Sequence, residues 1–142
     1  MSGKIIIVDL DGTLCEGGER IIFFLTKPKN YRAANAGVIH DEQIQHTKYI
    51  LDLLHANRDI IIVLTAREET CKKETLQWLD TNKIPYTDIY MRKNGDNRKD
   101  FIVKKELLKE IEKKYGKPFL AFEDRPDVIE MLKLEGVLVF QV

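Results

Sequence analysis

The sequence has few cysteines, no surplus of charge and no long apolar run, and each shortage excludes a class of protein. Only two of the 142 residues are cysteine, Cys15 and Cys71, and they form no CxxC or CxxH pattern. A disulfide framework is therefore excluded, and a zinc site is not expected. Lys and Arg together number 23, as do Asp and Glu, so no overall charge draws the chain to nucleic acid or to a membrane.

No stretch approaches the roughly 20 apolar residues that a membrane helix needs. The first apolar run, residues 5–8, is short and ends in an acid, so no secretory signal is expected. Apolar residues make up 44% of the chain and charged residues 32%, which is ordinary for a globular protein with a hydrophobic core. We therefore expect one domain over residues 1–142, with reduced thiols, in the cytoplasm and with no membrane partner.

Short apolar runs alternate with helical patterns along the chain. The expected strands are residues 4–8, 60–64, 88–91, 119–122 and 137–140. The expected helices are residues 41–56, 69–81, 100–114 and 126–134. We expect Asp41 or a neighbour to cap the first of these helices. This alternation predicts an α/β fold, with a mainly parallel sheet between helices on both faces.

Residues 14–40 interrupt the regular spacing. They contain Gly17, Gly18, Pro28 and Gly37 and show no clean period. We predict a small flap or hairpin insertion over the sheet edge, since the segment is too short for a separate cap domain.

Polar residues follow four of the apolar runs. In open α/β sheets, ligands bind beyond the carboxyl ends of the strands, so these residues are candidates for one site. In chain order they are Asp9 and Asp11, then Thr65 and Arg67, then Arg92, and finally Glu123, Asp124 and Arg125. Their combined chemistry suits a phosphate and a metal ion.

The segment DLDGT, residues 9–13, carries the strongest signal. Asp9 and Asp11 are two apart on extended chain, so their carboxylates point the same way. Because two close carboxylates repel, a cation should join them, and oxygen ligands favour Mg²⁺. One carboxylate can attack phosphorus while the other protonates the leaving oxygen and later activates water. Gly12 permits a sharp turn. A calcium EF-hand loop is excluded, because its sixth and twelfth positions would be Leu14 and Arg20.

The other candidates have competing interpretations. Thr65 can offer a hydroxyl and a backbone N–H to a phosphate oxygen, or it can cap the next helix. Lys104 can neutralise the nucleophile and the phosphate together, and Lys105 is its rival; either is also a plausible solvated charge. Asp124 suits a metal ligand, whereas Asp127 can orient a neighbour or cap a helix.

These motifs resemble those of the haloacid dehalogenase (HAD) superfamily of phosphohydrolases. The matching features are DLDGT, the Thr of VLTAR, a helix lysine and an acidic pair after the last core strand. The resemblance implies a three-layer α/β/α Rossmannoid fold with no large cap domain. It also implies Asp9 as nucleophile, Asp11 as acid/base, Thr65 and Lys104 as phosphate ligands, and Mg²⁺ on Asp9, Asp124 and the carbonyl of Asp11.

A narrower resemblance, over residues 92–100, 103–106, 123–131 and 140–142, is to the 3′-phosphatase domain of phage polynucleotide kinase/phosphatase. The match over residues 103–106 favours Lys104 over Lys105 as the helix lysine of the site. The family removes 3′-phosphates from nucleic acid ends, and its site arginines map to Arg67, Arg92, Arg98 and Arg125. The family usually has two aspartates before the last arginine, but here the first is Glu123, which leaves the role of that position open. Neither Gly3-Lys4 nor Gly116-Lys117 has P-loop spacing, so the resemblance predicts a phosphatase without a kinase half.

Local charge gives this substrate some support. Residues 92–105 hold six basic and two acidic residues, a local charge of +4, and arginine forks suit phosphates. Tyr31 and Tyr86 could stack on a base, although partly buried aromatics are the commoner case. A small-molecule phosphatase remains an alternative. A signalling receiver does not fit, because its phosphoacceptor would lie on a later strand, and the third strand here ends in Arg92.

Overall fold

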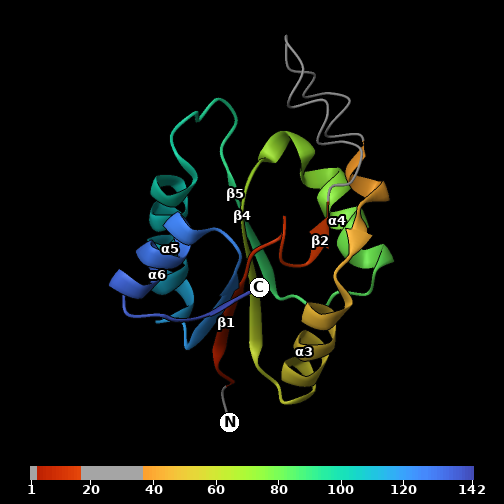
Figure 1. Cartoon of the computed structure of the whole chain (residues 1–142), viewed down its shortest axis with the longest axis horizontal. Helices are drawn as coiled ribbons and strands as arrows, with labels where there is room; N and C mark the ends of the chain where they lie inside the picture. The colour runs from red at the N-terminus through yellow and green to blue at the C-terminus, as the bar shows by residue number, and fades with distance from the viewer. Residues whose placement is uncertain (1–2, 17–36) are drawn as a thin grey trace.

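Within residues 3–16 and 37–142, which the computed structural model describes, five parallel strands form the central sheet in the order β5-β4-β1-β6-β7 (Figure 1). These strands are β1 (Ile5–Val8), β4 (Ile60–Glu68), β5 (Asp88–Arg92), β6 (Leu120–Glu123) and β7 (Leu138–Gln141). Because the strands run parallel, all their carboxyl ends lie at one edge of the sheet.

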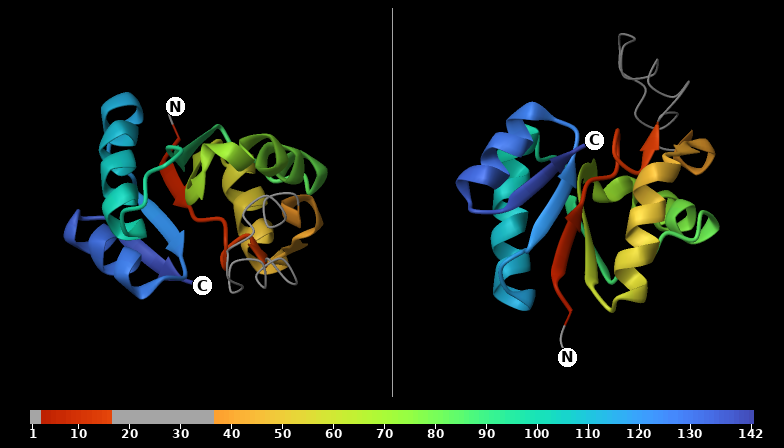
Figure 2. Two further views of the ribbon diagram at one scale, coloured as in Figure 1. Left: turned by 90° about the horizontal axis from the view of Figure 1, so that it is seen from above. Right: turned by 60° about the horizontal axis from the view of Figure 1, so that its bottom comes forward.

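Helices cover both faces of the sheet (Figure 2). They are α3 (Gln45–Ala56), α4 (Lys72–Thr81), α5 (Asp100–Tyr115) and α6 (Pro126–Leu134). Helices α5 and α6 lie on one face, and α3 and α4 lie on the other. Among the described helices, none combines the length and the apolar character that crossing a membrane requires. The predicted α/β class, with a mainly parallel sheet between two helical layers, is confirmed.

The strands are apolar on both sides because helices cover both faces of the sheet. In β1, Ile5 and Ile7 join the cluster under α5 and α6, whereas Ile6 and Val8 join the cluster under α3 and α4. Successive side chains of a strand point to opposite faces, so a strand buried on both sides has no polar alternation.

Most expected elements are found, with shifted ends. Helix α6 has the expected bounds, with a proline in its first turn. Strand β4 is longer than expected, because after a register shift Glu68 still pairs with Arg92 of β5. Helix α3 begins later than expected, and its N-cap residue, Ile44, makes no side-chain cap. The expectation that Asp41 caps this helix is wrong, since the Asp41 carboxylate binds Arg67 instead.

Parts of the segment predicted as a flap are described. Strand β2 (Cys15–Glu16) pairs antiparallel with β3 (Glu42–Gln43), and a 3₁₀ helix covers Gly37–His40. Residues 17–36, which include Tyr31, lie outside the described residues. The predicted flap therefore stays a prediction.

Candidate active site

Three carboxylates meet at the carboxyl edge of the sheet. Asp9 directly follows β1, Glu123 ends β6, and Asp124 comes next. One oxygen from each lies within 4.8 Å of the others. Asp9 and Glu123 are 5% and 2% exposed. The neighbouring parallel strands β1 and β6 end at the same level, which brings residues far apart in sequence together.

Lys104 of α5 supplies the positive charge of this cluster. Its Nζ donates to Asp9 Oδ1 at 2.7 Å and to Glu123 Oε2 at 2.8 Å, and the residue is 2% exposed. Burial alone would lower the pKa of Lys104, but the charges of Asp9 and Glu123 outweigh it and raise the pKa. The side chain is therefore an ammonium cation. Its rival Lys105 lies at the surface, 3.4 Å from Glu135.

The pKa values of Glu123 and Asp124 are both raised in this cluster. Burial raises the pKa of Glu123, with Asp9 adding to the shift and Lys104 opposing it. Burial and then the neighbouring Asp9 carboxyl raise the pKa of Asp124 to about 6. One ammonium thus faces three carboxylates, and the excess of negative charge disfavours the fully ionised cluster.

A divalent cation fits this arrangement. The Oδ1 atom of Asp124 is buried and has no hydrogen-bond partner among the described residues. A buried carboxylate oxygen without a partner is costly, and a hard cation would satisfy it and offset the excess charge.

Gly12 makes the approach of Asp124 possible. Its φ is +82°, and a Cβ at this position would lie 2.0 Å from Asp124 Oδ2. Only glycine meets both requirements, since any side chain would strain the backbone and displace the carboxylate.

Asp11 points to a different partner, Arg67. Arg67 Nε donates to Asp11 Oδ2 at 2.9 Å and Nη2 donates to Oδ1 at 2.6 Å, a bidentate pair. The same guanidinium also donates to Asp41 Oδ2 at 3.0 Å and to Thr75 Oγ1 at 3.1 Å. Burial would lower the pKa of Arg67, but Asp11 raises it, so the cation is permanent. Arg67 thus holds the expected acid/base residue.

Thr65 lies beside this network at the buried part of β4. It is 1% exposed, and its hydroxyl accepts a hydrogen bond from the Arg67 backbone N–H at 3.1 Å. It does not cap the next helix, because the N-cap residue of α4 is Cys71. The hydroxyl therefore stays at the sheet edge, where a phosphate ligand was expected.

Arg92 is an internal clamp in this structure. Its Nε donates to the carbonyl of Ala66 at 2.8 Å, and its Nη1 to the carbonyls of Asp96 at 2.8 Å and Arg98 at 2.6 Å. Its Nη2 donates to Asp100 Oδ1 at 2.6 Å. These contacts connect β4 to the loop after β5, so Arg92 holds that loop in place. Its guanidinium nitrogens donate to groups within the protein and are not directed at a ligand.

Arg98, by contrast, lies on the surface. It makes bidentate contacts with Glu106, 2.7 Å for each hydrogen bond, and it also binds Asp96. Its side chain is 47% exposed. Exposed ion pairs of this kind contribute little stability, so the guanidinium can exchange its partners at low cost.

Arg125 follows the same pattern. Its side chain is 53% exposed, and it binds Asp100 Oδ2 at 3.0 Å and Asp127 at 3.2 Å. Asp100 therefore bridges Arg125 and the buried Arg92. Of the four expected substrate arginines, the structure leaves Arg98 and Arg125 at the surface.

Sequence reasoning missed three contributors to this site. Thr13 is buried and donates from its Oγ1 to Asp9 Oδ2 at 3.1 Å, which its place in DLDGT could have suggested. Asp41 was expected only as a helix cap and Asp100 was given no role, because their partners Arg67 and Arg125 lie elsewhere in the chain. Tyr86, considered as a stacking residue, packs partly buried against the core under α3 and α4.

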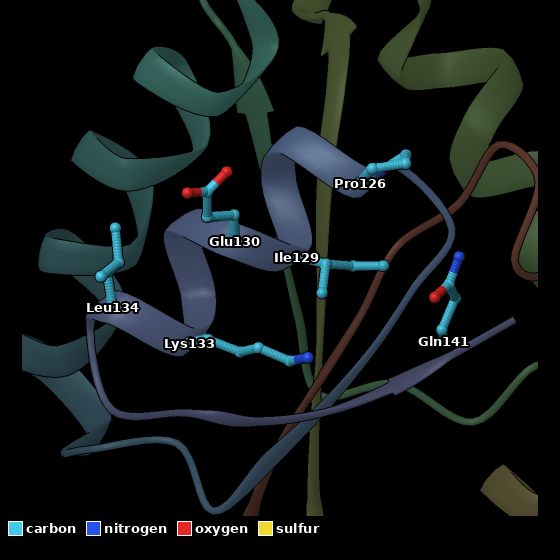
Figure 3. Close-up of a pocket in the computed structure, with 6 residues that line it drawn as sticks. All are labelled: Pro126, Ile129, Glu130, Lys133, Leu134 and Gln141. Atoms are coloured by element: carbon cyan, nitrogen blue, oxygen red, sulfur yellow. The ribbon is translucent and has the colours of Figure 1, made fainter.

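A separate hollow of about 390 Å³ lies between α6 and β7 (Figure 3). It is lined by Pro126, Ile129, Glu130, Lys133, Leu134 and Gln141. The acidic cluster does not line it, so this hollow is distinct from the candidate site.

Comparison with known proteins agrees with this geometry. The family model of the polynucleotide kinase PNKP phosphatase domain matches residues 3–142. A solved chain of the Pnkp1/Rnl/Hen1 complex is 29% identical over 99% of this chain, with a TM-score of 0.82. This chain covers 46% of that one, so it spans less than half the length of its relative.

More distant structures share the fold. A putative phosphatase from Clostridium difficile is 17% identical, with 99% of this chain and 85% of that one covered and a TM-score of 0.70. A HAD-superfamily hydrolase from Geobacter sulfurreducens is 16% identical, with 98% and 86% covered and a TM-score of 0.65. With the family model spanning almost the whole chain, this protein belongs to the PNKP phosphatase domain family of the HAD superfamily and is a phosphatase.

Proposed function

We propose that the chain is a Mg²⁺-dependent phosphatase that removes the 3′-phosphate from nucleic acid ends through an aspartyl-phosphate on Asp9. The observation that carries this proposal is the environment of Asp9. Its carboxylate is buried and held by Lys104 at 2.7 Å and Thr13 at 3.1 Å, with Asp124 beside it. A carboxylate held in one orientation is prepared to act as a nucleophile.

In the first step, a carboxylate oxygen of Asp9 bonds to phosphorus and the bond between phosphorus and the 3′ oxygen breaks. Asp11, in its acid form, donates its proton to that leaving oxygen. Lys104 and the hydroxyl of Thr65 would hold the phosphate oxygens, since both lie at the same edge of the sheet.

In the second step, Asp11 is a carboxylate and takes a proton from water. The water oxygen bonds to phosphorus, the bond from phosphorus to Asp9 breaks, and inorganic phosphate leaves. Asp11 is then protonated again, so the cycle closes. The bidentate pair of Asp11 with Arg67 fits the base form that this step needs, which makes Arg67 a residue that positions the base.

Mg²⁺ would bind the carboxylates of Asp9 and Asp124 and the carbonyl of Asp11, and would offset the charge of the phosphate near Asp9. The unpartnered buried oxygen of Asp124 supports this ligand set.

The polynucleotide substrate is supported by the family and by surface arginines. The chain matches the PNKP phosphatase domain, and a relative with 29% identity belongs to a complex named for RNA repair. Arg98 and Arg125 are exposed and could contact a phosphodiester next to the end.

A two-substrate assay tests the proposal. We expect hydrolysis of a 3′-phosphorylated oligonucleotide to exceed that of a nucleoside monophosphate, and to require added Mg²⁺. A preference for the monophosphate would point to a small-molecule phosphatase. Asp9→Asn should abolish turnover while the circular dichroism spectrum stays unchanged, and an active Asp9→Asn variant would exclude the covalent route.

We also propose one domain over residues 1–142 and a location in the cytoplasm. Both cysteines are buried, and the sequence has too few cysteines for a disulfide framework, which suits a reducing compartment. Cell fractionation would test the location.

A further inference from the structure

Strand β7 is an edge strand with an unusual surface. Leu138 and Phe140 of β7 and Val142, which follows the strand, form a row that is 61%, 50% and 47% exposed, and the strand carries no charged residue. Edge strands normally carry charges or are covered, because apolar edges invite unwanted contacts. The exposed row therefore needs a physical explanation.

The row lies on the α3–α4 side of the sheet. Val139 packs into the cluster under α5 and α6, and Gln141 lines the hollow beside α6 (Figure 3). Since side chains alternate along a strand, Phe140 points to the opposite face. There its ring stacks on Phe122, with centroids 5.7 Å apart and an angle of 26° between the planes.

Phe122 gives this ring a rigid support. It is 7% exposed and belongs to the same buried cluster as Val8 and Leu10. Phe140 is thus backed on one side by the core, while half of its surface stays open to solvent. An aromatic ring fixed from behind is preorganised to receive another flat ring.

Phe140 lies close to the proposed nucleophile. Val8, Phe122 and Phe140 are register partners across β1, β6 and β7, and Asp9 directly follows Val8. Two strand spacings of about 4.8 Å, roughly 10 Å in all, separate β1 from β7. Figures 1 and 2 agree that the C-terminal end of β7 lies beside the turn after β1.

The leaving group should extend toward this side. Arg67, which holds Asp11, also binds Thr75 of α4, so the Asp11 network lies on the α3–α4 side. In the proposed reaction Asp11 protonates the 3′ oxygen, and that oxygen carries the nucleoside. The base would therefore leave the catalytic edge on the face where Phe140 is exposed.

We infer that Phe140 is a stacking platform for a base at or next to the 3′ end of a single-stranded nucleic acid. This inference rests on the proposed function and names how its substrate is held. Stacking on an aromatic ring tolerates every base, so Phe140 would strengthen binding without sequence preference.

The test compares Phe140→Ala and Phe140→Trp with the wild type on a 3′-phosphorylated tetranucleotide and on an aryl phosphate. For Phe140→Ala we expect KM for the tetranucleotide to rise about tenfold or more relative to the change for the aryl phosphate. Phe140→Trp should retain tetranucleotide binding. Leu134→Ala, an 82% exposed position at the end of α6, is the control for losing surface apolar area.

A binding measurement covers the case in which the alanine variant fails to fold. In an Asp9→Asn, Phe140→Trp double variant, the new indole should be quenched by the tetranucleotide, against the constant signal of Trp78, the one native tryptophan, which is 1% exposed. Unchanged fluorescence at saturating tetranucleotide would refute the platform.

The outcomes separate the inference from the proposed function. If the wild type hydrolyses the tetranucleotide but Phe140→Ala leaves the KM ratio unchanged, the platform is wrong and the 3′-phosphatase stands. If the wild type ignores the tetranucleotide, both are wrong. If Phe140→Ala instead turns a dimer into a monomer in light scattering, with the KM ratio unchanged, the apolar row is a contact between copies of the chain.

Discussion

Replacing Lys104 with methionine tests the electrostatics of the site most directly. The ammonium is 2% exposed and binds two buried carboxylates, at 2.7 Å and 2.8 Å. Methionine has a similar length but no charge, so Lys104→Met leaves Asp9 and Glu123 buried without their counter-ion. Burial, and after it the charge of Asp9, already raise the pKa of Glu123, and without Lys104 the main opposing charge would be lost.

The expected cost is large. Removing one partner of a buried ion pair typically costs about 3–5 kcal/mol. For a domain of this size, each kcal/mol lowers Tm by about 4 °C, so Lys104→Met should lower Tm by about 12–20 °C. The loss should be smaller near pH 5 than near pH 8. Protonation removes the uncompensated charge, and the folded carboxyls of the variant bind protons more readily than the unfolded ones.

Urea unfolding of Lys104→Met, Lys105→Met and the wild type at both pH values measures the effect. Lys105→Met is the matched control. Lys105 is exposed and lies 3.4 Å from Glu135, so the loss of its charge should cost less than about 1 kcal/mol of stability. Equal losses for the two variants, or a Lys104→Met loss that does not shrink at low pH, would refute the reasoning.

Three further predictions follow from single contacts. Gly12→Ala should weaken Mg²⁺ binding at least about tenfold in calorimetry, because its Cβ would lie 2.0 Å from Asp124 Oδ2; unchanged affinity would exclude Asp124 as a ligand. Mg²⁺ affinity should rise as pH increases through about 6, where Asp124 loses its proton, whereas Asp124→Asn should bind Mg²⁺ weakly with little pH dependence in this range. Arg92→Lys should cost about 2–4 kcal/mol in urea unfolding and speed amide exchange in residues 93–99, because lysine cannot reach all the carbonyls that Arg92 binds. A variant with unchanged stability and a changed KM would contradict this structural role.

Local spacing in the sequence was enough to predict the sheet and the first acids of the site. The Ile/Val run of β1 shows no polar alternation, which indicates burial on both faces. Pro126 marks the start of α6 because its fixed φ and missing N–H suit the first turn. Asp9 and Asp11 are only two residues apart, so their placement at a strand end needed no knowledge of distant contacts.

The arginines show where such reasoning stops. In sequence Arg67, Arg92, Arg98 and Arg125 are equivalent, since each follows or precedes a strand or helix end. In the structure Arg67 is buried and binds Asp11, and Arg92 is buried and donates to backbone carbonyls. Arg98 and Arg125 are exposed. Which donors are already used depends on partners that only the folded chain brings near.

The sequence by itself determined the alternation of strands and helices, and therefore which edge of the sheet collects the polar residues. The tertiary structure decided the partners: Lys104 meets Asp9 across a separation of 95 residues, and Asp41 meets Arg67 across 26. Successive residues of a helix point about 100° apart, so Lys104 and Lys105 cannot both face Asp9, and the packing of α5 on the sheet decides which of them does. Hydrophobic periodicity is a local property, whereas ion pairing depends on distances that packing alone sets.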